Sequence, residues 1–270
     1  MDLYNSLQLR EIFHIEFLRW LARKVKPDNY VLKGGVNLRF FFKSFRYSED
    51  MDIDVFRIRV DTLKDIVLKI LSAPSFNDSL RTFGCERIIP PDIAKAKQTE
   101  TTQRFKVHLI NSEGIDLFTK IEFSRRGFKG EIVSEPVSDI VLREYKIPPL
   151  MVSHYDISST ILQKVEVLAL RSVIQARDIF DLYILSPQHN KNIDISKNLK
   201  QFNISLFKKA RENIFAIDFS QFRDTVISYL SPNDQAVYNK TTSWDEIRLN
   251  VENFIEELEK KCQFLQPSNN

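Results

Sequence analysis

Residues 33–55 of the chain read KGGVNLRFFFKSFRYSEDMDIDV, and this stretch decides the fold of the N-terminal half. Before it, residues 30–32 (Tyr-Val-Leu) predict a short strand that runs directly into Lys33-Gly34-Gly35. Residues 36–45 predict a helix, and the alternation of apolar and polar residues over 51–58 predicts a second strand. The stretch therefore predicts a strand, a glycine turn, a helix and a strand in immediate succession.

Three aspartates lie on one face of the second strand. Since side chains alternate along a strand, Met51 and its apolar neighbours face a core, while Asp50, Asp52 and Asp54 share the opposite face, about 7 Å apart. Three like charges on one face are costly unless something positive offsets them, and Mg²⁺ prefers carboxylate oxygens. The pattern favours a metal site. The alternative is an edge strand with a solvated acidic face.

The glycine pair stands where a strand meets a helix. Backbone N–H groups at a helix N-terminus bind phosphate, and glycine allows a close approach because it has no Cβ. Gly34-Gly35 therefore predicts a phosphate-binding turn beside the aspartates, and we group Lys33 and Ser48 with it as nucleotide-binding candidates. A tight turn without a ligand is the alternative.

A strand predicted over residues 117–124 supplies a further carboxylate. Its alternation places Lys120, Glu122 and Ser124 on one face, with Ile121 and Phe123 toward the core. Glu122 is the candidate for a third metal ligand. A Lys120–Glu122 pair on an exposed sheet face is the alternative.

Composition limits the classes of protein that fit. The chain has 270 residues, is 43% hydrophobic and carries a net charge of +3, which excludes a disordered chain and a strongly basic nucleic-acid coat. Two distant cysteines fit a reducing cytoplasm. Because the N-terminus has no signal peptide and no apolar run reaches about 20 residues, we expect a cytoplasmic protein without a membrane span.

The pattern of elements changes in the middle of the chain. Residues 1–148 alternate predicted strands and helices, whereas residues 149–270 are helical, and Pro148-Pro149 marks the boundary. We therefore predict an α/β (α+β) domain over 1–148 and a helical domain over 149–270.

The helical half contains a polar constellation at residues 164–183, KVEVLALRSVIQARDIFDLY. In an unbroken helix Lys164, Arg171 and Asp178 recur at every seventh position on one face. Lys164 and Asp178 would then lie about 21 Å apart along the axis, and only a break would bring them together. An ordinary amphipathic helix with a solvated face is the alternative.

Two stretches together resemble a known family. KGG…RYSEDMDID is similar to the signature of the DNA polymerase beta-type nucleotidyltransferase superfamily: a Gly-Gly or Gly-Ser turn, a helix, then Asp-x-Asp on the next strand. More narrowly, LKGG…RYSEDMDID, followed by Lys164 and Arg177-Asp178-Ile179-Phe180-Asp181-Leu182, resembles the AbiEii-like toxins of type IV toxin–antitoxin, abortive-infection systems. The resemblance spans about residues 30–185.

The resemblance implies a mixed-sheet nucleotidyltransferase core with flanking helices, and a C-terminal helical bundle that contributes to the active-site cleft. It also implies a Mg²⁺-dependent enzyme that transfers a nucleotide from an NTP to an acceptor, and tRNA is the acceptor that the resemblance suggests. Such an enzyme would act as a toxin with a cognate antitoxin. The alternatives are nucleotidylation of a protein and an NTP-binding regulatory module without chemistry.

The implied site residues fall into three groups. The catalytic set is Asp50, Asp52, Lys164 and Asp178; the metal ligands are Asp50, Asp52 and Glu122; the nucleotide-binding set is Lys33, Gly34, Gly35, Ser48, Lys164, Arg171 and Arg177. Asp54, Lys120 and Asp181 are further candidates without an assigned role.

Overall fold

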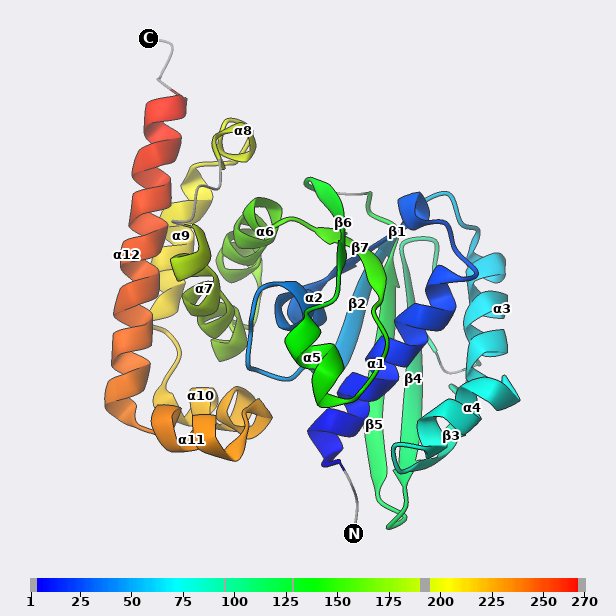
Figure 1. Ribbon diagram of the computed structural model, residues 1–270. Helices are drawn as coiled ribbons and strands as arrows, with labels where there is room; N and C mark the ends of the chain where they lie inside the picture. Colours follow the sequence, from blue (N-terminus) through cyan, green and yellow to red (C-terminus); the bar gives the residue numbers. More distant parts are fainter. Residues whose placement is uncertain (1–3, 95, 128, 190–194, 267–270) are drawn as a thin grey trace. The chain divides into compact units, whose positions relative to one another are not determined.

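The computed structural model describes residues 4–94, 96–127, 129–189 and 195–266 and contains two compact units (Figure 1). The first, here the sheet unit, comprises Met1–Phe41 and Tyr47–Tyr155. The second, here the helical unit, comprises Phe42–Arg46 and Asp156–Asn270. The division falls after Tyr155, whereas the sequence analysis placed the domain boundary after Pro148.

The sheet unit is built on a mixed seven-stranded sheet, which confirms the predicted α/β (α+β) class. The strand order is β3-β4-β5-β2-β1-β7-β6, with the β1–β7 and β2–β5 pairs parallel and the other pairs antiparallel. The strands are β1 (Tyr30–Lys33), β2 (Asp50–Val55), β3 (Cys85–Ile89), β4 (Thr102–Asn111), β5 (Asp116–Ser124), β6 (Ile132–Pro136) and β7 (Met151–Tyr155).

Helices cover one face of this sheet, where the main hydrophobic core lies. The helices of the unit are α1 (Ser6–Ala22), the 3₁₀ turn η1 (Pro27–Asn29), α2 (Gly34–Phe41), α3 (Val60–Leu71), α4 (Pro74–Arg81) and α5 (Asp139–Glu144). Figure 1 shows α1 lying across the sheet. Apolar side chains of α1, α3 and α4 form one cluster with strand residues such as Met51, Ile53 and Phe123. This core fixes which face of β2 and β5 is left for polar side chains.

The helical unit contains α6 (Ile157–Leu170), α7 (Ala176–His189), α8 (Ser196–Leu199), α9 (Ser205–Ile214), α10 (Phe219–Thr225), η2 (Ile227–Tyr229), α11 (Pro232–Tyr238) and α12 (Thr241–Leu265). The long helix α12 packs on α7, α8 and α9, and α6 packs on α7 and α9. Trp244 on α12 is fully buried and stacks on Phe222 of α10, with ring centroids 4.3 Å apart. Among the described residues, no helix has both the length and the apolar character needed to cross a bilayer.

Three elements differ from the sequence predictions. The helix expected to reach Phe45 ends at Phe41, because Lys43 adopts a left-handed conformation with φ of 53°, which a helix cannot contain. The sequence analysis predicted neither β3 nor β7. Both are five-residue strands, and β7 begins just after Pro148-Pro149, so the prolines mark a loop inside the sheet unit.

Candidate active site

The acidic face of β2 has the predicted alternation. Met51 and Ile53 are fully buried in the core, whereas Asp50 and Asp52 lie partly buried on the opposite face. Ser48, just before the strand, donates a hydrogen bond from its Oγ to the backbone oxygen of Asp50 at 2.8 Å. The hydroxyl thereby fixes the backbone at the point where the first carboxylate enters the sheet.

Gly34 lies directly against the Asp52 carboxylate. Its φ is +70°, a conformation that L side chains rarely adopt, and a Cβ built on it would stand 2.7 Å from Asp52 Oδ2. Glycine is therefore required here for two independent reasons. Helix α2 begins at this residue, so its N-terminal turn starts beside an acidic side chain, as the sequence predicts for a phosphate-binding turn next to the aspartates.

Strand β5 places a carboxylate and a cation beside these aspartates, and β4 adds a second cation. In the parallel register Asp50 faces Lys120 and Asp52 faces Glu122. Lys120 Nζ contacts Asp50 Oδ2 at 2.8 Å, and Arg104 of β4 contacts Glu122 Oε2 at 2.6 Å. The structure thus brings the three predicted metal ligands to neighbouring positions of one sheet face. Within the described residues no group of three or more His, Cys, Asp or Glu side chains converges as a metal cluster.

Asp52 differs from its acidic neighbours in its electrostatics. Burial raises the pKa of its carboxyl above the ordinary value; the nearby Glu122 and Asp50 raise that pKa further, while Lys33 and Lys120 oppose the increase. In the described part of the chain no ion pair or hydrogen bond to the Asp52 side chain is found. A cation placed here would therefore gain a carboxylate that no protein cation already holds.

Asp54 is engaged by two side chains of the sheet unit. It is buried, and it accepts a hydrogen bond from Lys33 Nζ at 2.5 Å and another from the Tyr155 hydroxyl at 2.7 Å. Burial and the neighbouring Asp54 both raise the pKa of the Tyr155 hydroxyl, which stays a donor. These contacts join β1, β2 and β7, and they explain why the third aspartate lies outside a two-carboxylate motif.

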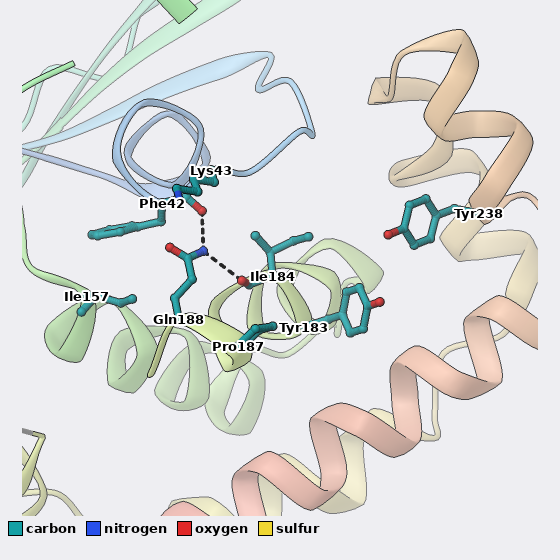
Figure 2. A pocket seen from close by; sticks show the side chains of 8 residues that line it. All are labelled: Phe42, Lys43, Ile157, Tyr183, Ile184, Pro187, Gln188 and Tyr238. Atoms are coloured by element: carbon teal, nitrogen blue, oxygen red, sulfur yellow. Dashed lines mark hydrogen bonds between the residues drawn. The ribbon is translucent and has the colours of Figure 1, made fainter. Parts of the chain in front are cut away.

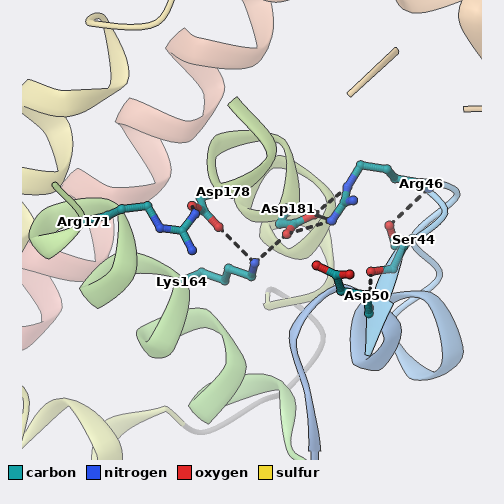
Figure 3. A network of polar contacts seen from close by, with 8 residues as sticks. Ser44, Arg46, Asp50, Lys164, Arg171, Asp178 and Asp181 are labelled. Atoms are coloured by element: carbon teal, nitrogen blue, oxygen red, sulfur yellow. Dashed lines mark hydrogen bonds and ion pairs between the residues drawn. The ribbon is translucent and has the colours of Figure 1, made fainter. Parts of the chain in front are cut away.

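The second constellation forms because the segment 164–181 contains a break. Helix α6 ends at Leu170, Arg171 is extended with ψ of 133°, and α7 begins at Ala176. As a result Lys164 Nζ lies 3.2 Å from Asp178 Oδ1 and 2.6 Å from Asp181 Oδ2 (Figure 3). Arg171 contacts the other oxygen of Asp178 at 2.5 Å. The sequence left one or two helices open, and the structure has two.

Arg46 completes this cluster and was missed by the sequence analysis. Its guanidinium binds Asp181 through Nε at 3.2 Å and Nη2 at 3.0 Å, and both residues are buried (Figure 3). Arg46 belongs to the quoted stretch RYSED, which the sequence analysis used. Its partner Asp181 lies 135 positions further along the chain, so the pairing could not be predicted from the motif. Arg177 is partly buried, and no ion pair to it is found among the described residues.

The cluster holds three cations and two carboxylates. Burial alone would raise the pKa of Asp181, but Arg46 and Lys164 outweigh it, and the resulting pKa lies below the ordinary value. Burial would likewise lower the pKa of Lys164, and Asp181 and Asp178 outweigh it, so that pKa is raised. Both groups therefore remain charged at neutral pH.

We predict that Gly34→Ala destabilises the protein more than Gly114→Ala does. Both glycines have a left-handed φ, +70° and +79°, which costs an L residue roughly 1–2 kcal/mol. Only at Gly34 does the added Cβ also meet a carboxylate, since nothing lies within 4 Å at Gly114. Urea unfolding of the two variants measures the difference, and equal losses would show that the contact with Asp52 is unimportant.

We predict that Asp181→Asn lowers the free energy of unfolding by roughly 3–5 kcal/mol, because it leaves Arg46 and Lys164 buried without their shared carboxylate. Asp224→Asn is the matched control, since Asp224 is an exposed residue of α10 and its loss should change stability by less than about 0.5 kcal/mol. Chemical denaturation measures both. Similar values for the two variants would contradict a stabilising role for the cluster.

The same carboxylate predicts a pH dependence. Because the folded-state pKa of Asp181 lies below its unfolded value, its contribution is complete above about pH 4 and is lost as the pH falls through the folded pKa. The raised pKa of Lys164 acts at the other end, where its contribution is lost only as the pH rises above about 10.5. Below pH 4, Asp181→Asn should therefore show a shallower fall of unfolding free energy with pH than the wild type. Parallel acid limbs would refute this.

Comparison with known proteins identifies the family. The family model described as "Nucleotidyl transferase AbiEii toxin, Type IV TA system" matches residues 16–250, which is most of the chain. No curated protein sequence matches this chain.

Solved structures show the same fold at low sequence identity. MenT4, a nucleotidyltransferase toxin from Mycobacterium tuberculosis, is 15% identical with a TM-score of 0.60, covering 95% of this chain and 87% of its own. JHP933 from Helicobacter pylori is 20% identical with a TM-score of 0.54, covering 97% and 95%. The fold, the glycine turn beside Asp52 and the family match agree, and the chain belongs to the AbiEii nucleotidyltransferase toxin family.

Proposed function

We propose that this chain transfers a nucleotide from an NTP to an RNA acceptor, with tRNA the expected class, as the cytoplasmic toxin of a toxin–antitoxin pair with a cognate antitoxin. Membership of the AbiEii family supports the toxin and transferase parts of the proposal. The observation that carries the chemistry is the contact between Gly34, at the start of α2, and the Asp52 carboxylate. A helix N-terminus that binds phosphate and a carboxylate that binds a cation are the two parts that an NTP–metal complex requires.

The donor set on this sheet face fits Mg²⁺. Asp50 and Asp52 offer hard carboxylate oxygens from one strand, and we propose Glu122, from the neighbouring strand, as the third ligand. When bound, the metal activates the attacking oxygen and neutralises charge on the leaving pyrophosphate. Lys120 contacts Asp50 and Arg104 contacts Glu122, so these cations offset the repulsion among the acidic side chains of this face.

The backbone and basic residues of the sheet unit would receive the phosphates. The N–H groups of Gly34 and Gly35 lie at the start of α2, where the helix dipole favours an anion. Lys33, the last residue of β1, adds positive charge near Asp52. Ser48 would act through the backbone of Asp50, whose oxygen its hydroxyl already binds.

In the helical unit the geometry supports a positioning role for the carboxylates. Asp178 and Asp181 both bind Lys164 Nζ, which holds this ammonium in one place. We propose that Lys164 and Arg171 bind the phosphates of the nucleotide, with Arg177 as a further basic contact. Asp178 is engaged by both Lys164 and Arg171, which favours orientation of these cations over a role as general base.

The proposal is tested by label transfer. We would incubate the purified protein with Mg²⁺, total tRNA and each α-³²P-labelled NTP in turn, alongside Asp52→Asn. Because a bound metal contributes several kcal/mol of transition-state stabilisation, Asp52→Asn should lower transfer by roughly 10²–10³-fold. Asp61→Asn, an exposed aspartate of α3, is the matched control and should keep full activity.

Each outcome separates the candidate functions. Label on tRNA that disappears with Asp52→Asn or with EDTA supports the proposal and names the base. Label on protein instead of RNA would replace it by protein nucleotidylation. NTP binding without label on any acceptor would leave a non-catalytic NTP-binding module.

A further inference from the structure

The helical unit contains a cavity of about 570 Å³ that lies outside the acidic strand face and the Lys164 cluster. Its walls come from the segment after α2, from α7 and from the end of α11. Phe42, Lys43, Tyr183, Ile184, Gln188 and Tyr238 are the lining residues that matter here (Figure 2). The volume lies within the range of small-molecule sites.

Two sequence features shape the walls. Lys43 is exposed and left-handed, so the chain turns sharply after the buried Phe42 and leaves the lysine at the edge. Pro187 lies inside α7 and has no N–H for the carbonyl of Tyr183; the Ser186 hydroxyl donates to that carbonyl instead, at 3.0 Å.

The amide of Gln188 ties α7 to the segment after α2 at the cavity wall. Its Nε2 donates to the backbone oxygens of Phe42 at 2.6 Å and Ile184 at 3.0 Å (Figure 2). Two carbonyl acceptors require the N–H side of the amide, so the orientation is determined by chemistry. Figure 2 shows the amide oxygen on the side away from Tyr183 and Tyr238, so Gln188 braces the cavity wall and does not face these rings.

Aromatic rings form the opposite wall. The centroids of Tyr183 and Tyr238 lie 6.5 Å apart, and Phe45 and Phe180 pack behind Tyr238 with centroids 5.3 and 5.8 Å from it. The tyrosines are therefore supported by other rings, and both remain partly exposed. Rigid, partly exposed rings are the surfaces on which unpaired bases stack.

We propose that this cavity binds an unpaired base of the acceptor RNA. The base stacks on the ring of Tyr183 and meets the ring of Tyr238, which lies at 76° to it, edge-on, while Lys43 contacts an adjacent phosphate. Every base has a ring face, so the site tolerates different sequences and selects single-stranded over paired RNA. This inference rests on the proposed function, because it specifies how the RNA substrate is recognised.

The test is a binding measurement that needs no catalysis. Fluorescein-labelled short single-stranded RNA, and the same sugar–phosphate chain without bases, are titrated into wild type, Tyr183→Leu and Tyr183→Phe, each checked for a cooperative melt. The wild type should bind the intact RNA more tightly than the abasic chain. Tyr183→Leu should weaken intact RNA roughly 5- to 100-fold and lose that preference, whereas Tyr183→Phe should keep it.

A charge variant tests the phosphate contact independently. Lys43→Gln should reduce the slope of log K against log salt by about 0.7, the value for one phosphate contact with a single strand. Lys208→Gln, an exposed lysine of α9, is the matched control and should leave the slope unchanged.

The outcomes separate this inference from the proposed function. Equal binding of intact and abasic RNA by the wild type, or unchanged binding by folded Tyr183→Leu, would overturn the base site. If Tyr183→Leu loses binding of free NTP and keeps RNA binding, the cavity belongs to the nucleotide donor, and the proposed base site is overturned as well. If RNA binding depends on the bases and on Tyr183 but the protein never labels RNA, the base site stands and the proposed nucleotidyl transfer fails.

Discussion

The helical unit depends on one buried carboxylate, that of Asp181. It is fully buried between Arg46 and Lys164, and removing a carboxylate from water costs several kcal/mol unless cations compensate it. Because those cations come from α6 and from the segment after α2, the carboxylate can be satisfied only when three separate stretches of chain are folded together. It therefore specifies one arrangement: α6 must end before α7 begins, and residues 42–46 must pack with the helices.

The sheet unit solves a different electrostatic problem, the crowding of like charges on an open face. Asp52 and Glu122 stand side by side in the parallel register of β2 and β5. Arg104 contacts Glu122 and Lys120 contacts Asp50. Acidic and basic side chains therefore pair across neighbouring strands, which offsets the repulsion among the carboxylates. The pKa of the Asp52 carboxyl is raised, and burial contributes more to this than its acidic neighbours do. The buried carboxylate against Gly34 is the position at which the proposed metal cation would relieve the most unfavourable charge.

What the sequence could predict follows from the range of the interactions involved. The period-two pattern over Met51, Ile53 and Val55 fixed the acidic face of β2, because side-chain alternation is a local property of the backbone. The same pattern grouped Asp54 with Asp50 and Asp52. Alternation cannot show that Tyr155, 101 positions away, binds Asp54. The break after Leu170 contains neither glycine nor proline, so no local signal predicts it. Contacts of Arg171 and Lys164 with α7 stabilise it. The role of Arg46 could not be predicted either, because its partner Asp181 lies 135 positions away.

Residues 42–46 connect these observations, since this short segment serves both the charge cluster and the cavity. Arg46 binds Asp181, while the carbonyl of Phe42 accepts from Gln188 at the cavity wall. Between them Lys43 adopts a left-handed φ that costs a non-glycine residue of order 1 kcal/mol, and such strain persists only where surrounding contacts impose it. Glycine at this position would remove the strain, but it would also remove the cation at the edge of the cavity. The presence of a lysine in a conformation that suits glycine is thus explained if its charge has a ligand to bind.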